Sequence, residues 1–162
     1  MSVNKERPHV YVLPEDDADR QLANGFLMDP SLSKQIQVLE EAGGWVKVLD
    51  NFGSVHVREM NRWPNRFMVL LIDFDGREDR FEHAKARIPE NLNDRVFILG
   101  ARTEPEDLKK AKLGSYEAIG RALAKDCRED TNTAWGHRLL QNNANEIARM
   151  REQLHPILFP SA

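Results

Sequence analysis

The feature that most constrains the fold of this chain is an apolar run at 67–72 that ends in Asp73-Phe74-Asp75-Gly76. A run of this length without alternating polar residues is typical of a strand that is buried on both faces of a parallel sheet. Ligands of such sheets bind at the carboxyl ends of the strands. Asp73 and Asp75 are therefore predicted to lie where chemistry is expected, and their carboxylates are hard oxygen ligands suited to Mg²⁺ or Mn²⁺.

The composition is that of one soluble globular domain. The chain has 162 residues, of which 30% are charged and 41% are hydrophobic, and a chain of this length can bury a substantial core. We therefore expect a single domain over residues 1–162. The formal net charge of −3 argues against a protein that holds nucleic acid by bulk electrostatics alone. A nuclease with a local basic patch or a bound cation is still compatible with this charge.

Cysteine content and hydropathy bear on the compartment. The single cysteine, Cys127, excludes a disulfide within the chain, which favours a reducing environment. The first residues contain no apolar stretch that resembles a signal peptide, and the run at 67–72 is too short to span a bilayer. We expect a cytoplasmic protein with no membrane partner.

Apolar segments and turn signals alternate along the chain. Strands are predicted at 10–13, 36–39, 67–72 and 96–99. Helices are predicted at 17–28, from Trp45 either to a break at 51–54 or on towards Met60, at 78–88, from Glu104, after Ser115, and at 139–154 before Pro156. Strands and helices in alternation, followed by helices alone, imply an α/β fold. We expect a mostly parallel four-stranded sheet flanked by helices, with a helical C-terminal third.

Acidic residues follow three of the predicted strands. These groups are Glu15 with Asp19, Asp73 with Asp75, and Glu104 with Glu106. Because the carboxyl ends of parallel strands lie at one edge of a sheet, we expect the carboxylates to gather there, where a divalent cation would relieve their repulsion. Glu15 and Asp19 are four residues apart and share a face if the first turn is helical. The expected metal ligands are Asp73, Asp75, Asp19 and Glu104.

The order of these motifs resembles that of a Toprim domain, the catalytic module of topoisomerases, bacterial primases, the ribosomal RNA maturases and the overcoming-lysogenization-defect (OLD) nucleases. In that family a glutamate follows the first strand, a glycine-bearing turn follows the second, and Asp-x-Asp ends the third. Here Glu15, Gly43-Gly44 and Asp73-Phe74-Asp75 stand at those places, and Asp19 matches an aspartate often found four residues after the glutamate. The resemblance covers residues 8–108, and residues 115–156 would form additional C-terminal helices.

The resemblance implies a Rossmann-like sheet and a Mg²⁺-dependent enzyme that processes phosphodiesters, most simply a small stand-alone nuclease acting on DNA or RNA. It also implies that Glu15 is catalytic in acid–base chemistry, while the aspartates hold Mg²⁺ or Mn²⁺. Asp16 stands where the family commonly has glycine, and Leu13-Pro14 is an unusual lead-in to the glutamate. These departures leave open a catalytically inactive Toprim-like domain that binds a partner protein.

Basic residues near the expected site are candidates for binding a phosphate backbone. Arg77 and Arg80 follow the paired aspartates, and Arg102 and Lys109 follow the fourth predicted strand. Nucleic acid is therefore the expected substrate. The polar segment 141–145 in the C-terminal helices offers a surface for a partner protein or for a homodimer.

A second enzymatic alternative is a phosphatase of the haloacid dehalogenase type. The segment Asp73-Phe74-Asp75-Gly76 also resembles the nucleophile motif of that family. That motif normally follows the first strand and precedes threonine, whereas here it lies near the middle of the chain and precedes Arg77. No Gly-rich loop of the Walker or dinucleotide-binding type is present in the sequence, so a nucleotide cofactor is not indicated.

Overall fold

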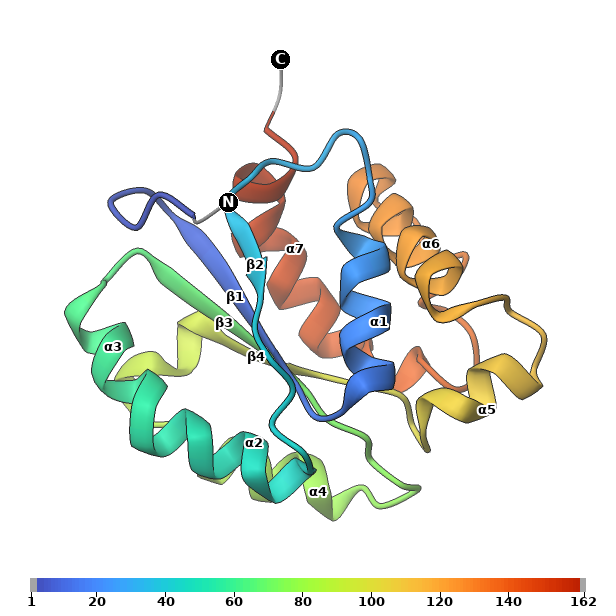
Figure 1. The fold of residues 1–162 in the computed structure, drawn as a ribbon, viewed down its shortest axis with the longest axis horizontal. Helices are drawn as coiled ribbons and strands as arrows, with labels where there is room; N and C mark the ends of the chain where they lie inside the picture. Colours follow the sequence, from blue (N-terminus) through green and yellow to red (C-terminus); the bar gives the residue numbers. More distant parts are fainter. Residues whose placement is uncertain (1–2, 161–162) are drawn as a thin grey trace.

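The structure, a computed structural model, describes residues 3–160 and places helices on both faces of one sheet (Figure 1). The predicted α/β fold is confirmed: four parallel strands form a sheet in the order β2-β1-β3-β4. The strands are β1 (His9–Pro14), β2 (Ile36–Val38), β3 (Arg66–Leu71) and β4 (Val96–Leu99). All four predicted strands are present, and β4 has the predicted bounds.

The two central strands, β1 and β3, are where the direction of the crossovers changes. From β1 the chain crosses to β2 on one side, and from β3 it crosses to β4 on the other. Their register runs from His9 beside Arg66 to Pro14 beside Leu71. In open α/β sheets, ligands bind outside the carboxyl ends of the strands at such a switch point. The residues that follow β1 and β3 therefore occupy the favoured position for a site.

Each face of the sheet is covered by its own set of helices (Figure 1). One face carries α1 (Asp17–Phe26), α6 (Tyr116–Glu129) and α7 (Ala144–Leu158); the other carries α2 (Trp45–Asn51), α3 (Val57–Arg62) and α4 (Asp79–Ala86). Alternate residues of β3 divide between the two cores, with Val69 in the first and Met68 and Leu70 in the second. None of the helices between residues 3 and 160 is long and apolar enough to cross a bilayer.

The shorter elements connect these layers. They are η1 (Phe52–His56), η2 (Glu90–Arg95), α5 (Pro105–Lys110) and η3 (Gln141–Asn143). The helix that begins at Trp45 does not break at 51–54, because α2 leads into the π-helical segment η1 and then directly into α3. Phe52 and Met60 are both buried in the same core. The wider π turn therefore keeps one apolar side of this long helix on the sheet.

The C-terminal helix differs from its prediction at both ends. It was expected at 139–154, but α7 begins after η3 and continues to Leu158 with Pro156 inside it. Proline removes the amide that would donate to the carbonyl of Glu152. Pro156 and Glu152 are both exposed, so water can reach the carbonyl that lacks its donor.

The free edge of β4 is covered by side chains of η3 and α7. The carboxamide of Asn143 accepts a hydrogen bond from the amide of Gly100 (3.0 Å) and donates one to its carbonyl oxygen (2.9 Å). Two further bonds complete the cover: the Ile98 amide donates to Glu146 (3.1 Å), and Arg149 donates to the Val96 carbonyl (3.0 Å). These groups replace a neighbouring strand. Asn143 is buried, so part of the segment expected to be a docking surface belongs to the fold.

Candidate metal centre

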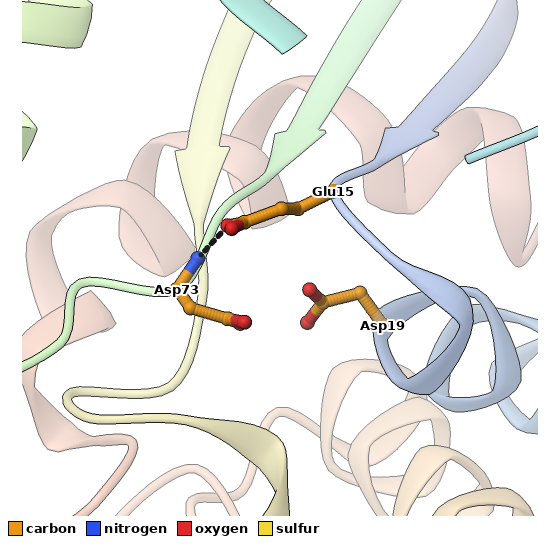
Figure 2. Close-up of side chains that lie close together, drawn as sticks. All are labelled: Glu15, Asp19 and Asp73. Atoms are coloured by element: carbon orange, nitrogen blue, oxygen red, sulfur yellow. Dashed lines mark hydrogen bonds between the residues drawn. The ribbon is translucent and has the colours of Figure 1, made fainter. Parts of the chain in front are cut away.

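Three acidic side chains lie together at the carboxyl edge of the sheet, where β1 and β3 end (Figure 2). Glu15 follows β1, Asp19 lies in the first turn of α1, and Asp73 comes two residues after β3. One carboxylate oxygen from each residue lies within 4.8 Å of the others. The structure thus brings together three of the residues that the sequence singled out.

The backbone amide and carbonyl of Glu15 are both hydrogen-bonded to neighbouring segments of the chain. Its amide donates to the carbonyl of Leu71 (2.9 Å), which extends the pairing of β1 with β3, and its carbonyl accepts from Gly43 (2.8 Å) and Gly44 (3.2 Å). Those glycines have φ values of +96° and +154°, which L side chains rarely adopt. The glycine turn after β2 therefore fixes the residue whose carboxylate accepts a hydrogen bond from the amide of Asp73 (2.6 Å).

Asp19 is placed by the N-terminus of α1. The preceding Asp16 has an extended backbone, and its carboxylate accepts a hydrogen bond from the amide of Asp19 (3.0 Å), a standard N-cap. Capping begins the helix at Asp17, and the side chain of Asp19 is then directed towards that of Asp73 (Figure 2). Only 1% of Asp19 is exposed.

Two carboxylate oxygens in this group are buried without any hydrogen-bond partner among the described residues. They are Oδ2 of Asp19 and Oδ1 of Asp73, and Asp73 itself is 8% exposed. A buried carboxylate that is charged and unpaired carries a large desolvation cost. Two charged carboxylates are therefore unfavourable in this arrangement, and the pair requires either a shared proton or a cation.

The pKa values of the three carboxyl groups are raised in the folded chain. Burial is the largest cause for Asp73 and, with the charges of Glu15 and Asp16, raises its pKa to about 8. Burial, followed by the charge of Asp73, raises the pKa of Asp19 well above its ordinary value. Burial also raises the pKa of Glu15, an effect that the amide of Asp73 partly offsets. In the absence of a cation, the carboxyl group of Asp73 therefore retains a proton near neutral pH.

Arg80, in the first turn of α4, is a cation close to the carboxylate group. Its guanidinium donates to the backbone carbonyl of Asp73 (2.7 Å) and lies 4.8 Å from the centroid of the Trp45 ring. Its charge lowers the pKa of Glu15, against the larger effect of burial. The sequence grouped Arg80 with Arg77 as a phosphate-binding candidate, but it contained no signal that Arg80 packs against Trp45 and restrains the backbone of Asp73.

Asp75 and Glu104, two of the expected ligands, do not belong to this group. Asp75 has a left-handed backbone (φ +52°), and its exposed side chain lies 3.6 Å from the guanidinium of Arg80. The amide of Asp75 donates to the carbonyl of Thr103 (2.9 Å) and that of Gly76 to the carbonyl of Arg102 (2.9 Å), so the segment after β4 holds this turn. Glu104 is exposed at the start of α5. Neither carboxylate therefore belongs to the group formed by Glu15, Asp19 and Asp73.

The predicted substrate-binding residues lie in different surroundings. Arg77 and Arg102 line the same cleft, which has a volume of about 430 Å³ and begins at Phe74 and Gly76 in the loop that carries Asp73. Arg77 is also exposed and bridged to Asp79 (2.7 Å). Lys109 is exposed on α5, and its ammonium group lies 4.7 Å from the ring of Tyr116. Two of the four basic residues that the sequence indicated therefore line one cleft, whose lining does not include Glu15, Asp19 or Asp73.

No protein-family model matches this chain, and no curated protein or solved structure matches it. The chemistry of the site is therefore argued from its donor atoms. The group offers carboxylate oxygens alone, with no histidine or cysteine among its members. Such a donor set suits Mg²⁺ or Mn²⁺, whereas Zn²⁺ sites in proteins are dominated by nitrogen and sulfur ligands.

Proposed function

We propose that the chain is a Mg²⁺- or Mn²⁺-dependent enzyme that processes phosphodiesters, most simply a small nuclease acting on DNA or RNA. The observation that carries this proposal is the buried pair of Asp19 and Asp73, whose unpaired oxygens lie beside Glu15. The position of the group at the switch point between β1 and β3 also supports it. The resemblance of the motif order to a Toprim domain favours the same function.

Each carboxylate has a distinct role in this proposal. Asp19 and Asp73 would hold the cation, which when bound polarises a phosphoryl group and neutralises charge that develops on its oxygens. Glu15 is anchored to the amide of Asp73 and is placed to act as a third ligand or as the general acid and base. Burial raises the pKa of Glu15, the direction that suits proton transfer near neutral pH.

The cleft that Phe74 and Gly76 line in the loop after β3 is the proposed place for the substrate. Its volume of about 430 Å³ lies within the range of small-molecule sites, roughly 300–1,000 Å³. Arg77 and Arg102 offer planar guanidinium groups that suit phosphate oxygens. The polar side chains of Gln141 and Asn142 also line the cleft, as do the acidic side chains of Glu78 and Glu82.

Cation binding is the first test, and the paired aspartates provide a matched control. Titration of the wild-type chain with Mn²⁺ or Mg²⁺ in a calorimeter should show one binding site. The substitution Asp73→Asn should weaken binding about tenfold or more because it removes a carboxylate that holds the cation. Asp75→Asn removes the same charge outside the group and should leave the affinity within about twofold. Equal losses in both variants, or no binding to the wild type at millimolar metal, would contradict the metal centre.

Cleavage is the second test. Labelled single- and double-stranded DNA and RNA should be cut by the wild-type chain with Mn²⁺ present, and the substitution Glu15→Gln should reduce cleavage on the order of a hundredfold or more. Cation binding without cleavage of any of these substrates would favour the inactive, protein-binding alternative. Trapping of an aspartyl-phosphate mimic on Asp73 would instead indicate phosphatase chemistry.

A further inference from the structure

The two edges of the sheet are finished in different ways. The edge of β4 is covered by Asn143, Glu146 and Arg149. At the opposite edge, β2 pairs with β1 alone. Among the described residues, no side chain or further strand hydrogen-bonds to the backbone of Ile36 or Val38 on the outer side.

The direction of the backbone groups in β2 follows from its pairing. Gln35 accepts a hydrogen bond from β1 (2.9 Å), and Leu39 donates one to β1 (2.8 Å), so the odd-numbered residues direct their polar groups to the neighbouring strand. Successive residues of a strand direct these groups to opposite sides. Ile36 and Val38 therefore present their amides and carbonyls outward, as an unpaired edge does.

The residues that flank this edge carry opposite charges. Lys34 and Glu40 are both exposed, and each is three positions from Gln37, the middle residue of β2. Neither takes part in an ion pair with another described residue. Both lie just outside the three residues of β2, with Lys34 at a bend, and both are even-numbered like the outward-directed Ile36 and Val38.

We propose that β2 is a dimerisation edge, which pairs in antiparallel fashion with β2 of a second copy of this chain around a two-fold axis at Gln37. In this register Ile36 lies opposite Val38 of the second copy, and Lys34 lies opposite Glu40 of the second copy. Opposite charges that face each other across two strands are favourable. No parallel register brings Lys34 opposite Glu40, so the charges favour the antiparallel one. The dimer therefore has one sheet that continues through both copies.

Reversal of the two charges tests this register directly. Sedimentation of the wild-type chain should show a monomer–dimer equilibrium that depends on concentration. Lys34→Glu and Glu40→Lys should each weaken the dimer about tenfold, because each places like charges opposite one another twice in the symmetric pair. The double variant K34E/E40K should restore the wild-type dissociation constant. Lys125→Glu, which changes the charge equally at an exposed position on α6, should leave the dissociation constant unchanged.

A backbone substitution provides an independent measurement. Val38→Pro removes an outward amide that pairs with nothing in the described chain, and proline is tolerated on edge strands. This variant should remain folded, with a melting temperature close to that of the wild type, but should sediment as a monomer. The proposal is overturned if the wild type is monomeric up to millimolar concentration, if the double variant dimerises no better than the single ones, or if K125E weakens the dimer as much as K34E.

Discussion

The backbone amide and carbonyl of Asp73 are both hydrogen-bonded to side chains, whereas its own carboxylate is not fully paired. Its amide donates to Glu15 (2.6 Å), and its carbonyl accepts from Arg80 (2.7 Å), whereas Oδ1 of the carboxylate has no partner among the described residues. Burial is the main reason that its pKa rises to about 8, far above the value of about 3.9 for an unfolded chain. Between these two pKa values the metal-free fold retains a proton that the unfolded chain has released.

This difference predicts how stability depends on pH without metal. Because the pKa of Asp73 is raised in the folded state, its favourable contribution is fully present below the unfolded pKa and is lost as pH rises towards about 8. The substitution Asp73→Asn removes the titration and should make the metal-free chain more stable than the wild type by about 1–3 kcal/mol at pH 8, with little difference near pH 4. Denaturant unfolding with a chelator present measures both.

The exposed neighbour supplies the control for that prediction. Asp75→Asn changes the same charge two positions away on a side chain that is 66% exposed, and its stability relative to the wild type should not vary over this pH range. A free energy of unfolding for Asp73→Asn that runs parallel to the wild type between pH 4 and 8 would contradict the raised pKa.

The residues of the candidate site were predictable to different degrees. Glu15 and Asp73 meet because their strands are neighbours in register, and the positions of both after apolar segments indicate this in the sequence. The spacing of Asp19 from Glu15 indicates a helical turn, as observed. The sequence could not indicate that Asp75 would turn away, because that depends on a hydrogen bond to the distant Thr103.

At the scale of helices, α1 and α6 cross with almost no space between their backbones. A Cβ atom on Gly120 would lie 2.1 Å from the carbonyl oxygen of Leu22, and one on Gly25 would lie 2.3 Å from that of Glu117. Such distances require the backbone to move. Since α1 also carries Asp19, the position of a metal ligand depends on this contact between two helices.

A single methyl group should therefore disturb both packing and the metal centre. Gly120→Ala should lower the free energy of unfolding by roughly 1–3 kcal/mol, because overpacking exceeds the gain in helix propensity, and it should also weaken Mn²⁺ binding. Gly53→Ala is the matched control, since its nearest neighbouring atom would be 4.0 Å away. That variant should be as stable as the wild type or slightly more stable. An unaltered melting temperature for Gly120→Ala would contradict the close crossing.

Strands were easier to predict from the sequence than helix ends. The bounds of β4 were predicted correctly, because a continuous apolar run indicates a strand that is buried on both faces. The limits of α7 were not, because they depend on long-range contacts. Asn143 just before the helix is engaged with Gly100, and Phe159 just after it packs in the core. No local pattern records either contact.

For the whole molecule, the C-terminal third shares a core with the sheet. Leu123 of α6 and Ile147 and Leu154 of α7 belong to the same buried cluster as Val69 of β3. Together with α1, the helices that follow the alternating part of the chain therefore cover one face of the sheet. Without them, that apolar face would be exposed to water.

Removal of these helices should abolish cooperative folding. A shortened chain of residues 1–114 lacks α6 and α7, and it should show no sharp thermal transition by circular dichroism and should aggregate at micromolar concentration. The full chain should unfold in one transition that is the same by tryptophan fluorescence and by circular dichroism. A cooperative transition in the shortened chain would show that the sheet and its remaining helices are an independent unit.

The cover over β4 has a consequence for how far copies of this chain can associate. With Asn143, Glu146 and Arg149 bonded along that side, each molecule has one strand to offer and not two. In a dimer formed through β2, both outer edges of the joined sheet would be β4 strands whose backbone groups are already hydrogen-bonded. Growth into filaments, the usual hazard of open sheets, is therefore blocked at two subunits.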